Sequence, residues 1–354
     1  MAEKIIMKGN EALAEAAIGA GCKHFFGYPI TPQTEVAAYM AKRLPQIGGT
    51  SLQAESEIAA INMVLGASAA GVRAMTSSSS PGISLKAEGI SYMAGCDLPC
   101  LIVNIQRGGP GLGGIQPAQE DYYQATKSTG HGDFHILVFA PATVQEMADL
   151  VSDAFDMADR YRMPAMVLAD GMLGQMMEPV ILPEENTGAQ IPKPWAVDGH
   201  KNAREHNIIN SLYLTPGDLE QIVVDRYARY AEVKEKEQRA EAYCAEDAEI
   251  LLVSFGATSR IVKAAIDQAR KEGVKVGLIR PITLFPFPDK MIDQYVPQAK
   301  LFLTVEMNMG QMVDDVRLAV NGRVPVEFYG RTGGVLPTPE EIVQVINNCI
   351  KGGA

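Results

Sequence analysis

The chain has 354 residues, of which 47% are hydrophobic and 21% are charged, and its formal net charge is −11. This length suits two domains, and the acidic balance disfavours nucleic acid and anionic membranes as partners because no basic patch offsets it. Residues 2–11 lack the apolar core of a signal peptide and no apolar run is long enough to span a bilayer, so we expect a cytoplasmic protein without membrane contact.

The first half of the chain alternates helical patterns with short, continuous apolar runs. Continuous apolar strands are typical of a sheet covered on both faces, and alternation of strand and helix favours a parallel sheet. Helices are predicted at residues 10–21, 32–44, 55–71, 81–95 and 143–161, and strands at 24–28, 72–77, 99–105, 135–140 and 164–170.

A connector rich in proline and polar residues follows at 178–215 and contains the single tryptophan. Residues 216–243 predict one long, charged helix, expected to bridge domains or to lie on a partner because its later half is polar on all sides. A second α/β series then predicts strands at 249–256, 274–281, 301–306 and 324–330, and helices at 258–273, 311–320 and 338–350. We therefore predict α/β domains at 1–180 and 247–354, joined by a connector with a long helix at 181–246.

Three loops of the first domain have unusual content and follow predicted strands: "GYPITP" at 27–32, "TSSSSPG" at 76–82 and "NIQRGGPGLGGIQPAQ" at 104–119. In open parallel sheets, ligands bind beyond the carboxyl ends of the strands, where such loops converge. The sequence therefore predicts a ligand site formed by these loops.

The glycine-rich loop satisfies G-x-G-x-x-G at residues 109–114, but its context is wrong for a dinucleotide site. Pro110 lies inside the motif, Pro117 interrupts the helix that would follow, and no acidic residue ends a following strand. A nucleotide-dependent oxidoreductase therefore stays a remote alternative. Arg107, just before the glycines, is suited to hold a carboxylate or phosphate through two hydrogen bonds, although a solvent-facing arginine is the simpler interpretation.

Glu57 stands in the first turn of a predicted helix, with Ala60 three residues and Gly66 nine residues further on. We expect these small residues to form a face on which another group packs closely. The helix macrodipole alone also explains a carboxylate in this position. Glu55 is the alternative candidate, two residues earlier and on a different face.

Thr31 and Pro32 form a favoured helix start, with threonine as N-cap and proline in the first helical position. Pro29 holds the residue before it in an extended conformation. Capping uses a lone pair of the threonine oxygen, so the hydroxyl hydrogen of Thr31 stays free for a ligand.

Together and in this order, the loops and the glutamate helix resemble the α subunits of the 2-oxoacid:ferredoxin oxidoreductases, thiamine-diphosphate enzymes that convert 2-oxoacids and CoA into acyl-CoA and CO2. The similarity covers nearly the whole chain, and "RGGPGLGGIQPAQEDYYQATK" is most similar to the branched-chain (2-oxoisovalerate) members. The 2-oxoglutarate members share "GYPITP" and "RGGP" and are the alternative. The resemblance implies an α/β fold: a parallel-sheet domain that binds the pyrimidine of thiamine diphosphate, then an α/β domain of the transketolase C-terminal type.

The same resemblance implies roles for the site residues. Glu57, rather than Glu55, would be the catalytic glutamate that hydrogen-bonds N1′ of the cofactor's aminopyrimidine. Arg107 would neutralise the carboxylate of the 2-oxoacid, and Thr31 would hydrogen-bond the substrate. Contacts to the cofactor are expected from Tyr28, Pro29, Ile30 and Ser79.

Partners are implied as well. Related enzymes bind Mg-pyrophosphate through G-D-G, which this chain lacks; "ADGMLG" around Asp170 is its nearest string. A β subunit would therefore supply the Mg2+ half of the site. The five cysteines include no C-x-x-C pair, which leaves the [4Fe-4S] clusters to gamma and ferredoxin-like subunits and no metal to this chain. We expect a dimer of such heteromers that reduces ferredoxin; a non-catalytic scaffold subunit is the other rival.

Overall fold

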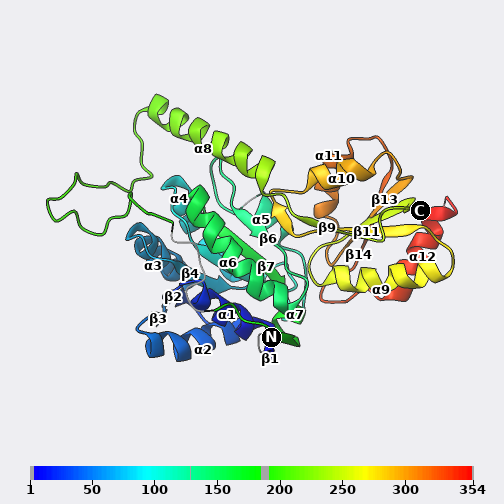
Figure 1. Cartoon of the computed structure of the whole chain (residues 1–354), viewed down its shortest axis with the longest axis horizontal. Helices are drawn as coiled ribbons and strands as arrows, with labels where there is room; N and C mark the ends of the chain where they lie inside the picture. Colours follow the sequence, from blue (N-terminus) through cyan, green and yellow to red (C-terminus); the bar gives the residue numbers. More distant parts are fainter. Residues whose placement is uncertain (1–3, 128, 185–190, 353–354) are drawn as a thin grey trace.

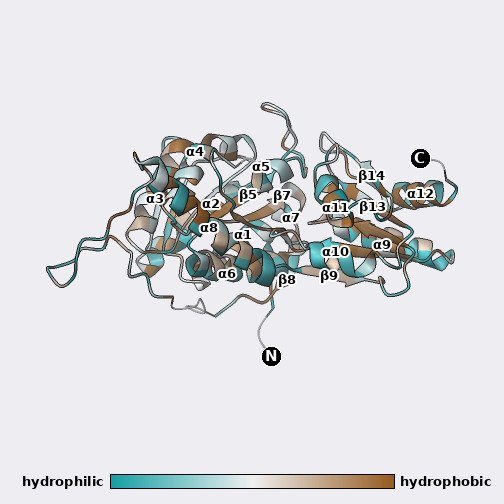
Figure 2. Ribbon diagram, turned by 90° about the horizontal axis from the view of Figure 1, so that it is seen from above, coloured by the Kyte–Doolittle hydropathy of each residue, from teal (hydrophilic) through white to brown (hydrophobic). Residues whose placement is uncertain are grey.

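The computed structural model describes residues 4–127, 129–184 and 191–352. Two α/β units lie next to each other along the long axis of the molecule, and helix α8 (Pro216–Lys236) runs across the first of them (Figure 1). Central strands are coloured as apolar and the outer surfaces of helices such as α10 (Asp289–Tyr295) as hydrophilic (Figure 2). Among the described helices, none has both the length and the apolarity to cross a membrane.

The first unit is built on a seven-stranded sheet with the order β12-β6-β7-β5-β4-β2-β3. Its neighbouring strands are parallel except for β12 against β6. Every residue of β4 to β7 is buried, as their continuous apolar runs predict. The strands are β2 (His24–Gly27), β3 (Thr50–Gln53), β4 (Ala74–Ser78), β5 (Leu101–Gln106), β6 (Leu137–Phe139), β7 (Ala165–Asp170) and β12 (Thr283–Phe285).

Helices of the first unit pack in pairs, α1 on α6 and α3 on α4. Their starts follow local chemistry: the hydroxyl of Thr143 caps α6 by accepting a hydrogen bond from the amide of Glu146 at 3.1 Å. A short antiparallel pair, β1 (Ile5–Lys8) with β8 (Met177–Val180), lies outside the main sheet. The helices are α1 (Gly9–Gly19), α2 (Thr34–Arg43), the 3-10 helix η1 (Leu44–Ile47), α3 (Glu57–Ala69), α4 (Pro81–Gly95), α5 (Tyr122–Thr126), α6 (Val144–Tyr161) and α7 (Gly171–Gln175).

The second unit has a five-stranded sheet with the order β14-β13-β10-β11-β9, in which β9 alone is antiparallel to its neighbour. The prediction of one helix over residues 216–243 is wrong in its last part. Helix α8 ends at Lys236, and β9 (Ala240–Tyr243) pairs with β11, because the edge of the sheet offers this segment a ladder of hydrogen bonds that an isolated polar helix lacks. The other elements are β10 (Ile250–Val253), α9 (Thr258–Lys271), β11 (Val276–Pro281), β13 (Leu301–Glu306), α11 (Met312–Val320), β14 (Val326–Gly330) and α12 (Pro339–Ile350).

The two units share structure at their junction. Strand β12, which follows the second sheet's β11, crosses over and pairs with β6 at the edge of the first sheet. Close by, Arg280 is 3% exposed, and its guanidinium donates two hydrogen bonds to Glu146, at 2.6 and 2.9 Å, and one to Glu241 at 2.7 Å. This strand and this ion-pair cluster fix the second unit against the first.

Candidate active site

Four neighbouring strands, in the order β5-β4-β2-β3, carry the predicted site residues at their carboxyl ends. Arg107 follows β5, Ser79 follows β4, and the segment 28–31 follows β2. Glu57 begins α3, just after β3. Because these strands are parallel, their following loops meet at one edge of the sheet. The structure therefore brings all the predicted residues to the same edge.

Arg107 is buried, with 7% of its surface exposed, so the interpretation as a solvent-facing arginine is wrong. Its Nη1 donates to the carbonyl of Thr31 at 3.0 Å, and its Nη2 donates to the carbonyl of Leu112 at 3.1 Å. Its backbone amide donates to the hydroxyl of Ser80 at 3.1 Å. The side chain and backbone amide of Arg107 thus tie together the loops that follow β2, β4 and β5.

Thr31 is not the N-cap of a helix, contrary to the sequence prediction. Helix α2 begins at Thr34, and Gln33 occupies the capping position without a side-chain capping bond. The side chain of Gln33 instead joins the loop to β4: it donates to the carbonyl of Tyr28 at 3.2 Å and accepts from the hydroxyl of Ser77 at 2.5 Å. Thr31 is exposed and meets Arg107 through its carbonyl oxygen, which leaves its hydroxyl outside this network.

The rest of the "GYPITP" loop faces outward. Tyr28 is 37% exposed, Pro29 is exposed and Ile30 is half-buried. Since Gln33 and Arg107 hold the loop by its carbonyl groups, the side chains remain available on the surface of the site.

Glu57 is 6% exposed, whereas its alternative Glu55 is exposed. Ser56 caps α3 by accepting a hydrogen bond from the amide of Ala59 at 3.1 Å, so Glu57 is fixed in the first turn. A Cβ atom at Gly82 of α4 would lie 2.7 Å from Oε1 of Glu57. Burial and this close approach favour Glu57 over Glu55 as the functional carboxylate.

The predicted face of small residues on α3 is only partly right. Ala60 is buried, but Gly66 is exposed and has no atom of the chain within 4 Å of an added Cβ, among the residues described. Nine residues make about two and a half helical turns, so Gly66 lies opposite Glu57. Close packing comes from the other helix instead: a Cβ at Gly89 of α4 would lie 2.5 Å from Ile61.

Gly82 offers a direct test of this packing. Alanine there would place its Cβ 2.1 Å from Oγ of Ser78 and 2.7 Å from Oε1 of Glu57, so we expect Gly82→Ala to displace the carboxylate and to destabilise the chain by about 1–3 kcal/mol. Thermal denaturation and cofactor titration measure both effects. Gly217→Ala is the matched control: it also follows a proline at a helix start, but no atom lies within 4 Å of its added Cβ in the described chain. Equal behaviour of the two variants would contradict the packing argument.

A buried polar network that the sequence reasoning missed supports the loop after β4. The Ser80 hydroxyl donates to Asp121 at 2.6 Å, and the Asn104 amide donates to the same carboxylate oxygen at 2.9 Å. Burial raises the pKa of Asp121, and these hydrogen bonds oppose the rise. Ser80 holds an unusual backbone conformation, with φ of 23°. The signals in the sequence that could have indicated this network were the "SSSSP" run and Asp121 in "QEDYY". Predicted Ser79 is fully buried, and its hydroxyl has no hydrogen-bond partner within the described chain.

The second unit packs against the glycine-rich loop that follows Arg107. The Glu120 carboxylate accepts hydrogen bonds from the amide of Gly109 at 2.6 Å, and from the hydroxyl of Thr332 at 2.9 Å and the amide of Gly333 at 3.2 Å. A Cβ at Gly334 would lie 2.3 Å from that of Gln116. The glycines thus allow two loops to approach closely, and the "GRTGG" segment of the second unit holds the loop that follows Arg107.

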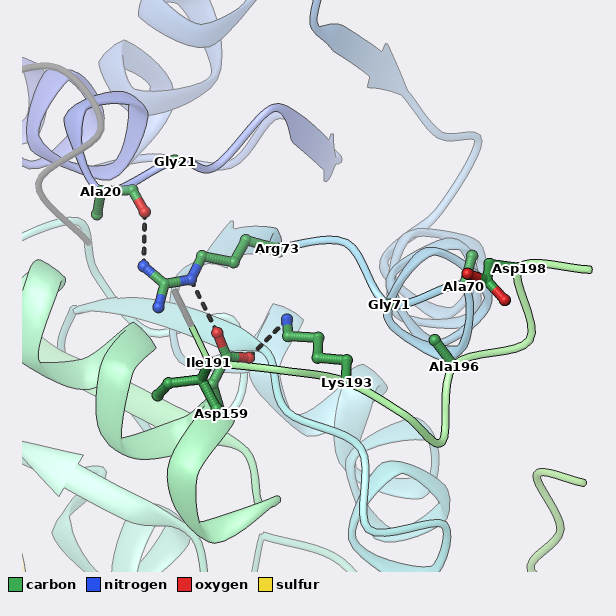
Figure 3. Close-up of a pocket in the computed structure, with 10 residues that line it drawn as sticks. All are labelled: Ala20, Gly21, Ala70, Gly71, Arg73, Asp159, Ile191, Lys193, Ala196 and Asp198. Carbon is green, nitrogen blue, oxygen red and sulfur yellow. Dashed lines mark hydrogen bonds and ion pairs between the residues drawn. The ribbon is translucent and has the colours of Figure 1, made fainter. Parts of the chain in front are cut away.

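A cavity of about 450 Å³ lies at the other, amino-terminal edge of the same sheet (Figure 3). Arg73 and Lys193 line it, and both pair with the carboxylate of Asp159, at 2.9 and 2.7 Å. Arg73 also donates to the carbonyl of Ala20 at 2.6 Å. These ion pairs join the connector to α6, and the cavity is separate from the loops that carry the predicted site.

Fold and site together define an α/β protein of the thiamine-diphosphate-binding class. The family description "pyruvate flavodoxin/ferredoxin oxidoreductase, thiamine diP-binding" matches residues 15–248, and "pyruvate:ferredoxin oxidoreductase core domain II" matches residues 248–342. The chain belongs to this family of 2-oxoacid oxidoreductases, as its sequence predicted. Ketoisovalerate oxidoreductase subunit VorB of Methanothermobacter marburgensis is 48% identical to it over 341 residues, with 96% of each chain covered.

Solved structures agree with the predicted fold class. The 2-oxoglutarate:ferredoxin oxidoreductase of Magnetococcus marinus, with 2-oxoglutarate, coenzyme A and succinyl-CoA bound, has a TM-score of 0.89 and 30% identity. That comparison covers 98% of this chain, which spans 65% of the oxidoreductase chain. A split-gene transketolase has a TM-score of 0.62 at 15% identity, covers 98% of both chains and shows the fold alone. The predicted fold, a thiamine-diphosphate-binding domain with a transketolase-type partner domain, is confirmed.

Proposed function

We propose that this chain is the α subunit of a thiamine-diphosphate-dependent oxidoreductase that converts a branched-chain 2-oxoacid and CoA into acyl-CoA and CO2 and reduces ferredoxin. The observation that carries this proposal is the convergence of Glu57, Arg107 and the 28–31 loop at one sheet edge, in a chain 48% identical to a ketoisovalerate oxidoreductase subunit. The 2-oxoglutarate alternative rests on the shared "GYPITP" and "RGGP" elements, and the 30% identity to the Magnetococcus enzyme also supports it.

The residues at this edge fit an aminopyrimidine ring. The Glu57 carboxylate is buried and makes no hydrogen bond to another described residue, so it has a free acceptor for a ring nitrogen. Within the described chain, the hydroxyls of Thr76, Ser78 and Ser79 are likewise buried without partners. Buried polar groups are ordinarily hydrogen-bonded, so these unsatisfied hydroxyls support a polar ligand. The hydroxyl of Ser78 lies close to Glu57, since both approach the position of a Cβ at Gly82.

Thiamine diphosphate, when bound, supplies the carbanion chemistry needed to cleave a 2-oxoacid beside its carbonyl. In our proposal Glu57 hydrogen-bonds N1′ of its pyrimidine ring, and Tyr28, Pro29, Ile30 and Ser79 surround the ring. Arg107 holds the substrate carboxylate: each of its terminal nitrogens donates to one carbonyl and keeps a second N–H for a ligand. The Thr31 hydroxyl, which is not used as a cap, is available to the substrate.

Partner subunits complete this proposal. A β subunit would bring Mg2+ and the pyrophosphate site, while gamma and ferredoxin-like subunits would carry [4Fe-4S] clusters, in a dimer of heteromers in the cytoplasm. Large apolar side chains stand exposed beside the site on β3, α3 and α4, which supports a covering partner. They are Leu52, Ile58, Leu85 and Tyr92, between 38% and 51% exposed.

Purification of the tagged chain from its own cells, without oxygen, tests the proposed function. We expect it to bring down a subunit with a G-D-G motif and protein-bound iron, and the complex to reduce ferredoxin with 2-oxoisovalerate at a kcat/KM at least tenfold above that with 2-oxoglutarate. The reverse preference would establish the alternative substrate. A lone chain that is fully active, or a complex that oxidises no 2-oxoacid, would contradict the proposal.

A further inference from the structure

Lys86 lies in the second turn of α4, and its exposed fraction is 0%. Its Nζ atom has no hydrogen-bond partner within the described chain. An ammonium group without partners is costly to bury, because it gives up its hydration without replacement. A lysine in this position therefore needs a reason beyond packing, since a methionine would fill the same space without that cost.

The helix geometry directs Lys86 toward Glu57. Residues three and four apart share one face of a helix, so Lys86 shares its face with Gly82 and Gly89. Those two glycines are the points where α4 touches α3: a Cβ at Gly82 would lie 2.7 Å from Glu57 Oε1, and one at Gly89 would lie 2.5 Å from Ile61. Lys86 thus stands on the face of α4 that packs against the helix of Glu57.

Glu57 is the ionisable group that opposes Lys86. It is the single charged residue of α3, while β4 and β5 contain none. Burial lowers the pKa of Lys86 to about 8 and the charge of Glu57 works against this lowering, so the amine is largely protonated at pH 7. Other ionisable groups around α4 are engaged elsewhere: Glu88 by the Tyr92 hydroxyl, His131 by the Tyr92 ring, and Asp121 by Ser80 and Asn104.

We propose that Lys86 is a positioning residue for the proposed reaction, and that its ammonium group supplies the counter-charge that holds the buried carboxylate of Glu57 in place to bind the aminopyrimidine of thiamine diphosphate. Lys86 acts through Glu57, since its side chain is buried on the face of α4 that packs against α3. This inference rests on the proposed function for its ligand, but the charge pair itself belongs to the unliganded chain.

A double-mutant cycle on the purified complex, stripped of cofactor, tests the pair. Removing one of two opposed buried charges leaves the other uncompensated, whereas removing both leaves none. We therefore expect Lys86→Met and Glu57→Gln each to lower the thermal midpoint by at least about 2 °C, and the double variant to recover most of that loss. Losses that simply add would overturn the proposal. If Lys86→Met yields no folded chain, Lys86→Gln takes its place in the same cycle.

Cofactor affinity gives a second readout. Titration with thiamine diphosphate and Mg2+ is expected to show a Kd raised at least tenfold by Lys86→Met in the Glu57 chain, but less than twofold in the Glu57→Gln chain. An equal effect in both backgrounds would overturn the positioning role. If the wild-type complex binds no thiamine diphosphate, the proposed function is wrong. If instead the losses of thermal midpoint in the double-mutant cycle simply add, only the Lys86 proposal is overturned.

The pH dependence of thermal stability supplies a third readout, and the direction of the change is predicted. A lysine with a lowered pKa in the folded chain binds fewer protons than it does when unfolded, between about pH 8 and 10.5. Stability from this group therefore rises with pH through that window. We expect the midpoint of the wild-type complex to rise between pH 8 and 10 relative to that of Lys86→Met. A constant difference across this range would contradict a buried, titrating amine.

Discussion

The complex with Glu57→Gln is expected to oxidise its 2-oxoacid at least about a hundredfold more slowly than the wild type, while still folding and assembling. Glutamine keeps the size of the side chain but cannot exchange a proton with a ring nitrogen, so the proposed contact with the cofactor is lost and the packing against Gly82 is kept. The measurements are ferredoxin or viologen reduction for the rate, and size-exclusion chromatography for assembly. Exchange of the cofactor's C2 proton for deuterium, followed by NMR, should slow in parallel.

Glu55→Gln is the matched control, because Glu55 lies two residues earlier and its side chain is exposed. We expect this variant to keep its rate within about twofold. A Glu57→Gln complex that assembles and works at the normal rate would refute the assigned role and would leave a scaffold function for the chain. If the Glu55→Gln complex is slow, the choice of Glu57 by its burial is wrong and Glu55 is the functional carboxylate.

Local patterns predicted the location of the site because parallel strands bring their following loops to one edge. The loops after β2, β4 and β5 were recognised from glycine, proline and serine content, and the sheet order places them side by side. Contacts between distant segments have no local signal. Strand β12 pairs with β6 although Thr283 and Phe139 are 144 positions apart in the sequence, and α8 ends early because β9 pairs with the edge of another sheet.

The role of an individual side chain could be predicted only where its chemical type allows few roles. Arg107 was singled out for its guanidinium, but its anchoring to the carbonyls of Thr31 and Leu112 depends on two loops that only the fold brings together. The wrong prediction of Thr31 as N-cap has the same origin, since Gln33 reaches Ser77 on a neighbouring strand and α2 begins only at Thr34. In the sequence Lys86 looks like an ordinary surface lysine, and only its burial in the fold indicates a special role.

The second unit also contacts the segment that follows Arg107. Gln119 donates to the carbonyl of Phe255 at 2.8 Å and accepts from the hydroxyl of Thr258 at 2.9 Å. Tyr122 donates to Asp315 at 2.6 Å, and burial raises the pKa of this tyrosine well above its ordinary value. Residues 119–122 therefore connect the second unit to the segment that follows Arg107.

Arg107→Met is expected to weaken use of the 2-oxoacid by about 2–4 kcal/mol, or roughly 30- to 1000-fold in kcat/KM. Methionine fills similar space but offers no N–H to the substrate carboxylate. Arg107→Lys keeps a positive charge and loses the planar pair of donors, so its kcat/KM should lie between those of wild type and Arg107→Met. Arg317→Met, at an exposed position on α11, is the control and should leave the reaction unchanged.

Two roles of Arg107 are separable in this experiment, because the side chain also holds the carbonyls of Thr31 and Leu112. If it binds the substrate, the KM for the 2-oxoacid rises while the Kd for thiamine diphosphate and the exchange of its C2 proton stay near wild type. If it only holds the loops, cofactor affinity falls together with kcat, and the lysine variant offers no rescue of KM. If the Arg107→Met complex has an unchanged kcat/KM, Arg107 has no role in the reaction. The substrate carboxylate would then need a partner outside this chain.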